Sequence, residues 1–137
     1  MTTKQTILLA SASPRRHELL GQLDVRFTVS PANIDESIIA GEAPRDYVVR
    51  MAREKARAGF EQNLGLLPTL GADTIVLLDG DILCKPASRA EARDMLQRLS
   101  GRTHNVYSAV ALALVVRIRE AYGTVEDDEI QSLEEAP

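Results

Sequence analysis

The sequence Leu67-Pro-Thr-Leu-Gly-Ala-Asp-Thr-Ile-Val-Leu-Leu78 is the most apolar stretch of the chain, and it predicts a long buried strand. Asp79-Gly80 follows directly, and this pair is typical of the tight turn of a hairpin, which here leads into Ile82-Leu83. Asp73 lies in the middle of the strand, with apolar residues on both sides. Because a buried carboxylate is costly unless it is paired or binds a metal, Asp73 is a candidate metal ligand or general base. A structural aspartate that is hydrogen-bonded to the backbone is the alternative.

Strands and helices alternate around this stretch, and the alternation predicts one α/β domain. Besides 67–78, the expected strands are 6–10, 25–30 and 103–118, and the expected helices are 14–22, 44–61 and 88–99. From residue 125 onward we expect a weak acidic helix or a frayed end. The residues expected to face inward on the three helices are Leu19, Leu20, Leu23, Val48, Met51, Ala52, Ala56, Ala92, Met95, Leu96 and Leu99.

Length and composition exclude several classes of protein. The chain has 137 residues, of which 45% are hydrophobic and 4% aromatic, so we expect one domain with a core of Leu, Val, Ile and Ala. No run approaches the ~18 apolar residues of a transmembrane helix, and the N-terminus lacks a signal-peptide pattern. Cys84 is the single cysteine, which makes a reducing, cytoplasmic setting the default expectation.

Charge is distributed unevenly along the chain. The formal net charge is −4, yet residues 120–137 contain seven acids and no Lys or Arg. Because all 16 basic residues but only 13 of the 20 acidic ones precede residue 120, the first 119 residues carry a net charge of +3. This charge is too weak for a general nucleic-acid binder, whereas it suits a small polyanionic ligand that is held by a few cations.

The segment Ser11-Ala-Ser-Pro-Arg-Arg16 predicts an anion-binding site. Ser13 is a suitable N-cap and Pro14 a suitable first helical residue, so backbone N–H groups and the helix dipole point to one place. Arg15 and Arg16 in the first turn are unfavourable for the dipole by ~0.3–1 kcal/mol each, and a bound phosphate would reverse that sign. The alternative is a surface helix start with two solvated arginines.

Three further charged positions are candidates for the same site. Lys55 lies on the apolar face of its helix, where it either points into a ligand site or extends along the edge of that face to solvent. Glu36 lies in a loop that has a proline at each end. If Glu36 faces Asp73, the two carboxylates could hold Mg²⁺. The alternative is that Asp35-Glu36 is only part of a turn. Lys85-Pro86 follows the hairpin, and Lys85 could equally be a solvated lysine.

Several short motifs stand in a fixed order along the chain. They are Leu-Leu-Ala-Ser-Ala-Ser-Pro-Arg-Arg at 8–16, Asp35-Glu36, Tyr47-Val-Val-Arg-Met-Ala-Arg-Glu-Lys-Ala56, Gly-Ala-Asp-Thr at 71–74, Lys85-Pro86 and Leu99-Ser-Gly-Arg-Thr-His104. In this order they resemble the Maf family (septum formation inhibitor-like proteins), whose members are nucleoside triphosphate pyrophosphatases. The resemblance extends from about residue 7 to residue 112, and several spaced motifs are more specific than any one of them.

The resemblance implies a single elongated α/β domain over 1–137, with a mixed twisted sheet flanked by helices, similar to the inosine triphosphatases. It implies cleavage between the α and β phosphates of a nucleoside triphosphate, which gives the monophosphate and pyrophosphate. By the same resemblance, Asp73 is the catalytic proton acceptor, and Glu36 and Asp73 hold a divalent cation, Mg²⁺ or Mn²⁺. The implied phosphate-binding residues are Ser11, Ser13, Arg15, Arg16, Lys55 and Lys85.

Two of the matching positions indicate the branch of the family. Arg15 after Ser-Pro and Thr74 after Asp73 resemble the branch that acts on dTTP and UTP, whereas the 7-methyl-GTP branch tends to have Trp and Gln there. Arg15 and Thr74 are therefore the implied specificity residues, and the implied role is the removal of pyrimidine and modified nucleotides. The expected partner is a nucleoside triphosphate, with no nucleic acid or membrane, and family members often pair as homodimers.

From Ala113 onward the chain departs from the family pattern. Residues 113–137 are a divergent acidic tail, so the domain is expected to lack part of the family's C-terminal portion, including a glutamine segment for base selection. A shortened protein that binds nucleotide or a protein partner without turnover is therefore the alternative function. We also expect open sheet surface, with marginal stability or self-association. A phosphatase with Ser11 or Ser13 as nucleophile is a weaker hypothesis, because no base is adjacent. His17, on the first expected helix, is expected to be exposed.

Overall fold

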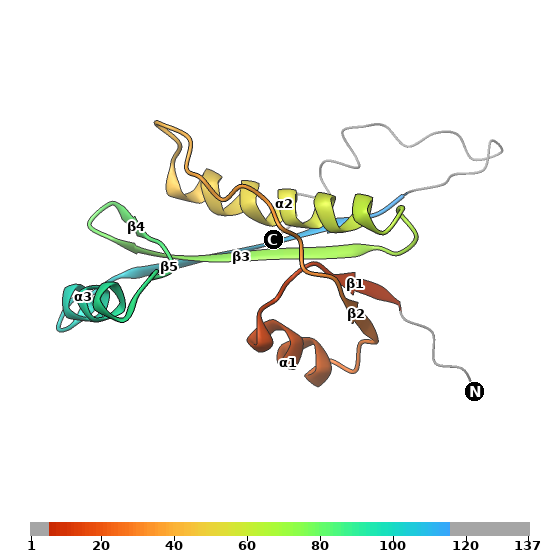
Figure 1. Ribbon diagram of the computed structural model, residues 1–137, viewed down its shortest axis with the longest axis horizontal. Helices are drawn as coiled ribbons and strands as arrows, with labels where there is room; N and C mark the ends of the chain where they lie inside the picture. Colours follow the sequence, from red (N-terminus) through yellow and green to blue (C-terminus); the bar gives the residue numbers. More distant parts are fainter. Residues whose placement is uncertain (1–5, 116–137) are drawn as a thin grey trace.

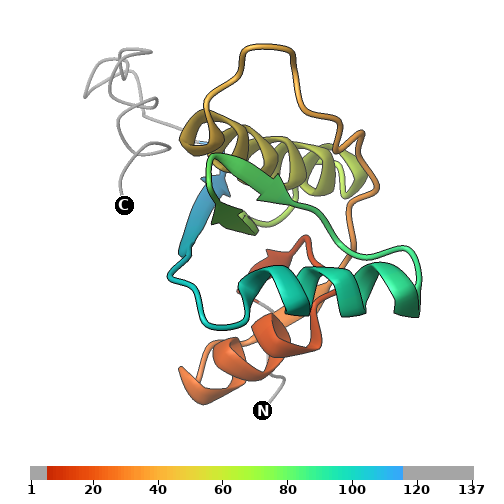
Figure 2. The same ribbon diagram turned by 90° about the vertical axis from the view of Figure 1, so that its left-hand side faces the viewer.

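The centre of the fold is a five-stranded mixed sheet in a computed structural model that describes residues 6–115 (Figure 1). Its elements are β1 (Ile7–Leu9), α1 (Pro14–Gln22), β2 (Phe27–Val29), α2 (Pro44–Gln62), β3 (Thr69–Leu78), β4 (Asp81–Leu83), α3 (Arg89–Leu99) and β5 (Asn105–Ala113). Helix α2 lies on one side of the sheet, and α1 and α3 lie on the other (Figures 1 and 2). The expected α/β class, a mixed sheet flanked by helices, is confirmed.

Strand β3 organises the sheet, because three other strands pair with it. β1 pairs with it in parallel at Thr69 and Leu70, and β4 pairs with it antiparallel at residues 76–78. β5 pairs with residues 69–77, and some of these residues also pair with β1 or β4. β5 therefore lies along one edge of β3, and β1 and β4 lie along the other. Within the described residues, positions 71–75 of the β1–β4 edge therefore have no strand partner, and this segment is called the β3 gap below.

Helix α2 supplies the core that covers one face of the sheet. Its residues Val48, Met51, Ala52 and Ala56 are buried, as the helical periodicity predicts, and they pack on β3 and β5. The helix approaches β3 so closely that a Cβ atom at Gly71 would lie 2.4 Å from the Ala52 carbonyl oxygen. The small residues at this contact thus bring α2 and its charged side chains against β3.

The opposite face of the sheet is more open. Leu23 is 68% exposed and Leu19 is also exposed, so the expectation that they face inward is wrong, and the same correction applies to Leu96. Neither α1 nor α3 contains a buried residue. The reason is that the apolar side chains of these helices find no covering layer within residues 6–115, whereas α2 lies along β3 and β5. The expected open sheet surface is present on β5, where Val106 and Val110 are exposed. The expected marginal stability and self-association stay predictions.

The expected strand 103–118 is shorter in the structure, where β5 ends at Ala113. The helix or frayed end expected from residue 125 lies outside the described residues, as does most of the acidic tail. Among the helices of residues 6–115, none has the length and apolar character needed to cross a membrane.

Candidate active site

Most of the predicted site residues lie beside the β3 gap, on both faces of the strand. Side chains alternate along a strand, and those of Asp73 and Ile75 face α2, whereas that of Thr74 faces α1. The loop after β1 reaches the same place, because the Ala10 N–H donates to the Leu70 carbonyl oxygen at 2.9 Å. One group of polar side chains therefore lies on each face, and consecutive residues of β3 join the two groups.

On the α2 face, one ammonium group contacts two carboxylates. Lys55 Nζ lies 2.9 Å from Asp73 Oδ1 and 3.1 Å from Glu36 Oε1. The Lys55 and Asp73 side chains are only 13% and 12% exposed. Lys55 thus points into the site, so its alternative, extension to solvent, is wrong. Removing either Lys55 or Asp73 would leave the other charge in a poorly solvated place, whereas the Glu36 side chain is 52% exposed.

The loop that carries Glu36 is fixed by a buried tyrosine. Tyr47 Oη donates to the Glu36 carbonyl oxygen at 2.6 Å, and the Tyr47 ring belongs to the core. Burial raises the pKa of the Tyr47 phenol, and the nearby Asp73 charge raises it further, so the phenol remains a donor at neutral pH. The neighbouring Asp35 instead accepts hydrogen bonds from the Ser37 hydroxyl and N–H, which lower the pKa of its carboxyl. Asp35 therefore shapes the turn, and Glu36 is the carboxylate of the site.

On the opposite face, the loop between β1 and α1 is held by its own serines. Ser13 is the N-cap of α1 and accepts from the Arg16 N–H at 3.4 Å, while Ser11 Oγ accepts from the Ser13 N–H at 3.1 Å. His17 Nε2 lies 2.8 Å from the Ser11 carbonyl oxygen, and since a carbonyl only accepts, Nε2 carries the proton. His17 is half-buried, so the expectation that it is exposed is wrong.

Arg16 connects this loop to the sheet. Its Nη1 donates to Ser11 Oγ at 3.3 Å, and its Nη2 donates to Thr74 Oγ1 at 3.4 Å. Thr74 Oγ1 in turn lies 2.9 Å from Ser108 Oγ on β5. The predicted residues Ser11, Ser13, Arg16 and Thr74 thus form one polar network, which also includes Ser108, a residue that the sequence pattern did not single out.

Two predicted residues are not joined to either group in the structure. The Arg15 side chain is 69% exposed and pairs with Glu18 at 3.5 Å along the surface of α1. Lys85 is exposed in the segment between β4 and α3, and no ion pair joins it to the site within residues 6–115. The roles predicted for Arg15 and Lys85 therefore stay predictions, which the geometry neither uses nor excludes.

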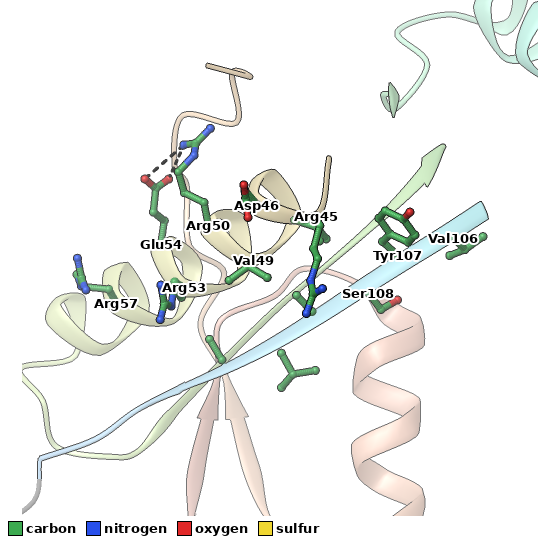
Figure 3. A pocket seen from close by; sticks show the side chains of 14 residues that line it. Arg45, Asp46, Val49, Arg50, Arg53, Glu54, Arg57, Val106, Tyr107 and Ser108 are labelled. Carbon is green, nitrogen blue, oxygen red and sulfur yellow. Dashed lines mark hydrogen bonds and ion pairs between the residues drawn. The ribbon is translucent and has the colours of Figure 1, made fainter. Parts of the chain in front are cut away.

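A groove of about 1180 Å³ lies between α2 and β5 (Figure 3). Arginines of α2, among them Arg45 and Arg57, line one side, and residues of β5 from Val106 to Ala111 line the other. The Arg50 guanidinium is occupied by Glu42, at 2.8 Å, and by Glu54, at 3.4 Å. Because Lys55, Asp73 and Glu36 do not line this groove, we place the chemistry at the β3 gap instead.

The donor set of the site fits a magnesium-type ion. Within residues 6–115, no three His, Cys, Asp or Glu side chains are placed to hold a metal together. Glu36 and Asp73 nevertheless provide two carboxylates that contact the same Lys55 ammonium. Mg²⁺ is usually held by one or two carboxylates together with water and substrate phosphates, so two are enough for this class of ion.

Extended similarity links this chain to known proteins. A family model described as "Maf-like protein" matches residues 6–134. The dTTP/UTP pyrophosphatase of Myxococcus xanthus is 53% identical over 137 residues, which cover 95% of this chain and 69% of that protein. The dTTP/UTP pyrophosphatase of Escherichia coli K12 is 54% identical over 108 residues, which cover 79% of this chain and 55% of that protein. This chain thus spans between about half and two thirds of these relatives.

One solved structure is also similar. It is a nucleoside-triphosphatase / dITP/XTP pyrophosphatase from Mycobacterium abscessus, and it is 20% identical to this chain, with a TM-score of 0.42. The similarity covers 80% of this chain and 64% of the other.

Proposed function

This chain belongs to the Maf family, and we propose that it hydrolyses dTTP and UTP to the nucleoside monophosphate and pyrophosphate. The two relatives with 53% and 54% identity that are named dTTP/UTP pyrophosphatase support the proposal. The single observation that carries it is the Lys55 ammonium between Asp73 and Glu36 on one face of β3, while Arg16 contacts the next residue of the strand, Thr74, on the other face. Such an arrangement provides cations for a polyphosphate on both faces of β3 and a carboxylate for a water molecule on one of them.

Binding of the triphosphate falls to the cationic groups around the β3 gap. The N-terminal turn of α1 presents backbone N–H groups, and Arg16 and Lys55 carry positive charge on the two faces of β3. A triphosphate that lies across the open edge of β3 would contact both cations. These charges would stabilise the negative charge that develops on the pyrophosphate leaving group.

Asp73 is the residue that we assign to the attacking water. Its Oδ1 is held by Lys55 at 2.9 Å, which fixes the direction of the carboxylate, and we assign Oδ2 as the atom that accepts the proton. The oxygen of that water attacks the α-phosphorus, the bond from the α-phosphorus to the bridging oxygen breaks, and pyrophosphate leaves. In this proposal Lys55 orients the Asp73 carboxylate and also contributes positive charge for the phosphates.

A divalent cation, Mg²⁺ or Mn²⁺, is part of the proposal, and Glu36 and Asp73 would hold it. When bound, such an ion neutralises phosphate charge and lowers the pKa of coordinated water. Tyr47 contributes by holding the backbone of Glu36, which keeps the second carboxylate near Lys55. We also propose a cytoplasmic location, which rests on the lone Cys84.

Turnover of a nucleotide panel tests the proposed function. The chain is incubated with dTTP, UTP, dCTP and dGTP, each with Mg²⁺ and with excess EDTA, and pyrophosphate is measured. We expect release from dTTP and UTP with Mg²⁺ and a loss of at least about tenfold with EDTA. If dTTP raises the melting temperature of the chain but releases no pyrophosphate, the protein binds nucleotide without turnover and the proposal is wrong.

A further inference from the structure

Arg50 is a side chain of α2 that binds the loop carrying Glu36 at two places. Its Nη2 donates at 2.8 Å to the carbonyl oxygen of Ser37, the residue directly after Glu36. Its Nε and Nη2 also donate to the two carboxylate oxygens of Glu42, at 2.8 Å and 3.0 Å. The guanidinium thus holds both ends of the segment 37–42, on the side of α2 that points away from β5 (Figure 3).

The segment 37–42 also closes on itself at this contact. Glu42 Oε1 accepts from the Ile39 N–H at 3.3 Å, and the Glu42 N–H donates to the Ile39 carbonyl oxygen at 2.9 Å. The side chains of Glu42 and Arg50 are only 10% and 24% exposed. A guanidinium that forks onto a carboxylate in a poorly solvated place has a fixed geometry, unlike an exposed ion pair.

Arg50 and Tyr47 together hold two consecutive peptide groups. Tyr47 Oη donates to the Glu36 carbonyl oxygen at 2.6 Å, and Arg50 donates to the next carbonyl along the chain. The Arg50 guanidinium also lies 5.6 Å from the centre of the Tyr47 ring, within the range of a cation–π contact. The Glu36 side chain is 52% exposed, so its own burial does not hold it in place. The direction of this carboxylate is therefore set by the backbone, which these two side chains attach to α2, the helix of Lys55.

We propose that Arg50 is a positioning residue that sets the affinity of the site for its divalent cation through Glu36. This inference rests on the proposed function, because it takes Glu36 and Asp73 as the residues that hold the cation. Without Arg50, the loop must be ordered each time a cation binds, which weakens binding. The charge of Arg50 alone has the opposite effect, because removal of a nearby positive charge strengthens the binding of a cation. A loss of affinity on removing Arg50 therefore separates positioning from electrostatics.

The test measures the binding of Mn²⁺ rather than turnover. The full chain and its variants are titrated with Mn²⁺, with and without the α,β-methylene analogue of dTTP, and the free ion is measured by electron paramagnetic resonance. We expect Arg50→Met to weaken Mn²⁺ binding by about tenfold, the lower end of the usual cost of losing a residue that orients a metal ligand. We expect Arg50→Lys to remain weakened by more than about threefold, because lysine keeps the charge but cannot make the forked contact.

Three further variants serve as controls. Arg57→Met removes an exposed positive charge from the same helix, and we expect its affinity to stay within about twofold of wild type. In a Glu36→Gln background, Arg50→Met is expected to change the affinity by less than about twofold, because its effect passes through Glu36. Arg50→Met leaves the Glu42 carboxylate without its main partner, so Arg50→Met/Glu42→Gln, which removes both charges, is measured as well and is expected to show the same loss. Melting temperatures confirm that each variant folds.

Four results would overturn the inference: an unchanged or tighter affinity in Arg50→Met and in the double variant, full recovery in Arg50→Lys, the same loss in the Glu36→Gln background, or no binding of Mn²⁺ by the wild-type chain under either condition. A chain whose Mn²⁺ affinity depends on Arg50 in this way but which releases no pyrophosphate from dTTP would refute the proposed hydrolysis and leave the role of Arg50 standing.

Discussion

Asp73→Asn is expected to reduce pyrophosphate release from dTTP by about 100- to 10,000-fold, the range of a general base. The amide keeps the size of the carboxylate, but its nitrogen cannot accept a proton from water. It also removes the negative partner of Lys55, which lies 2.9 Å from Asp73 Oδ1 in the intact site. Initial rates with saturating dTTP and Mg²⁺, measured for wild type and variant, give the ratio directly.

Asp81→Asn is the matched control for this prediction. Asp81 lies on β4 of the same sheet, its side chain is exposed, and it pairs with Arg98 at 3.2 Å rather than with the site. We expect this variant to retain activity within about twofold, because an exposed ion pair contributes little. Retention of more than a tenth of wild-type activity by Asp73→Asn, with a normal melting curve, would show that another group activates water.

Gly71→Ala is expected to destabilise the fold by about 3 kcal/mol, near the upper end of the usual cost of overpacking. A Cβ atom at position 71 would lie 2.4 Å from both the Ala52 carbonyl oxygen and the Ala56 nitrogen. Both are backbone atoms of α2, so relief requires the whole helix to move away from β3. Because Lys55 is on that helix, the movement would also separate Lys55 from Asp73. Thermal or urea unfolding followed by circular dichroism measures the effect, which we expect to be a shift on the order of 10 °C.

Gly21→Ala provides the comparison for the same substitution at an open position. Gly21 lies in the last turn of α1, and a Cβ atom there meets nothing within 4 Å. Alanine is the better helix former by up to about 1 kcal/mol, so this variant is expected to be neutral or slightly stabilised. Equal melting temperatures for Gly71→Ala and wild type would mean that α2 does not pack on β3 as closely as the structure shows.

The sequence predicted the main elements because their signals are local. The apolar run 67–78 and the Asp79-Gly80 turn give β3 and its hairpin, and the helical periodicity of 44–61 gives the buried face of α2. That periodicity also placed Lys55 on the inward face, where it meets Asp73. The sequence could not predict the open faces of α1 and α3, because an apolar stripe does not show what covers it.

The parts of the site that sequence reasoning missed depend on contacts between distant segments. Ser108 enters the network through the register of β5 against β3, which no local pattern specifies. Tyr47 reaches the Glu36 carbonyl across eleven positions. Local sequence made Glu36, Lys55 and Asp73 candidates with alternatives, and the resemblance to the Maf family assigned all three to one site.

The identity of the two products of dTTP hydrolysis shows which phosphorus atom the water attacks. Purified chain is incubated with dTTP and Mg²⁺, and the nucleotides and phosphates are separated by anion exchange and quantified. Because Asp73 and Lys55 are assigned to attack at the α-phosphorus and release of pyrophosphate, we expect dTMP and pyrophosphate in equal amounts. Formation of dTDP and inorganic phosphate, or no product under conditions in which dTTP binds, would contradict it.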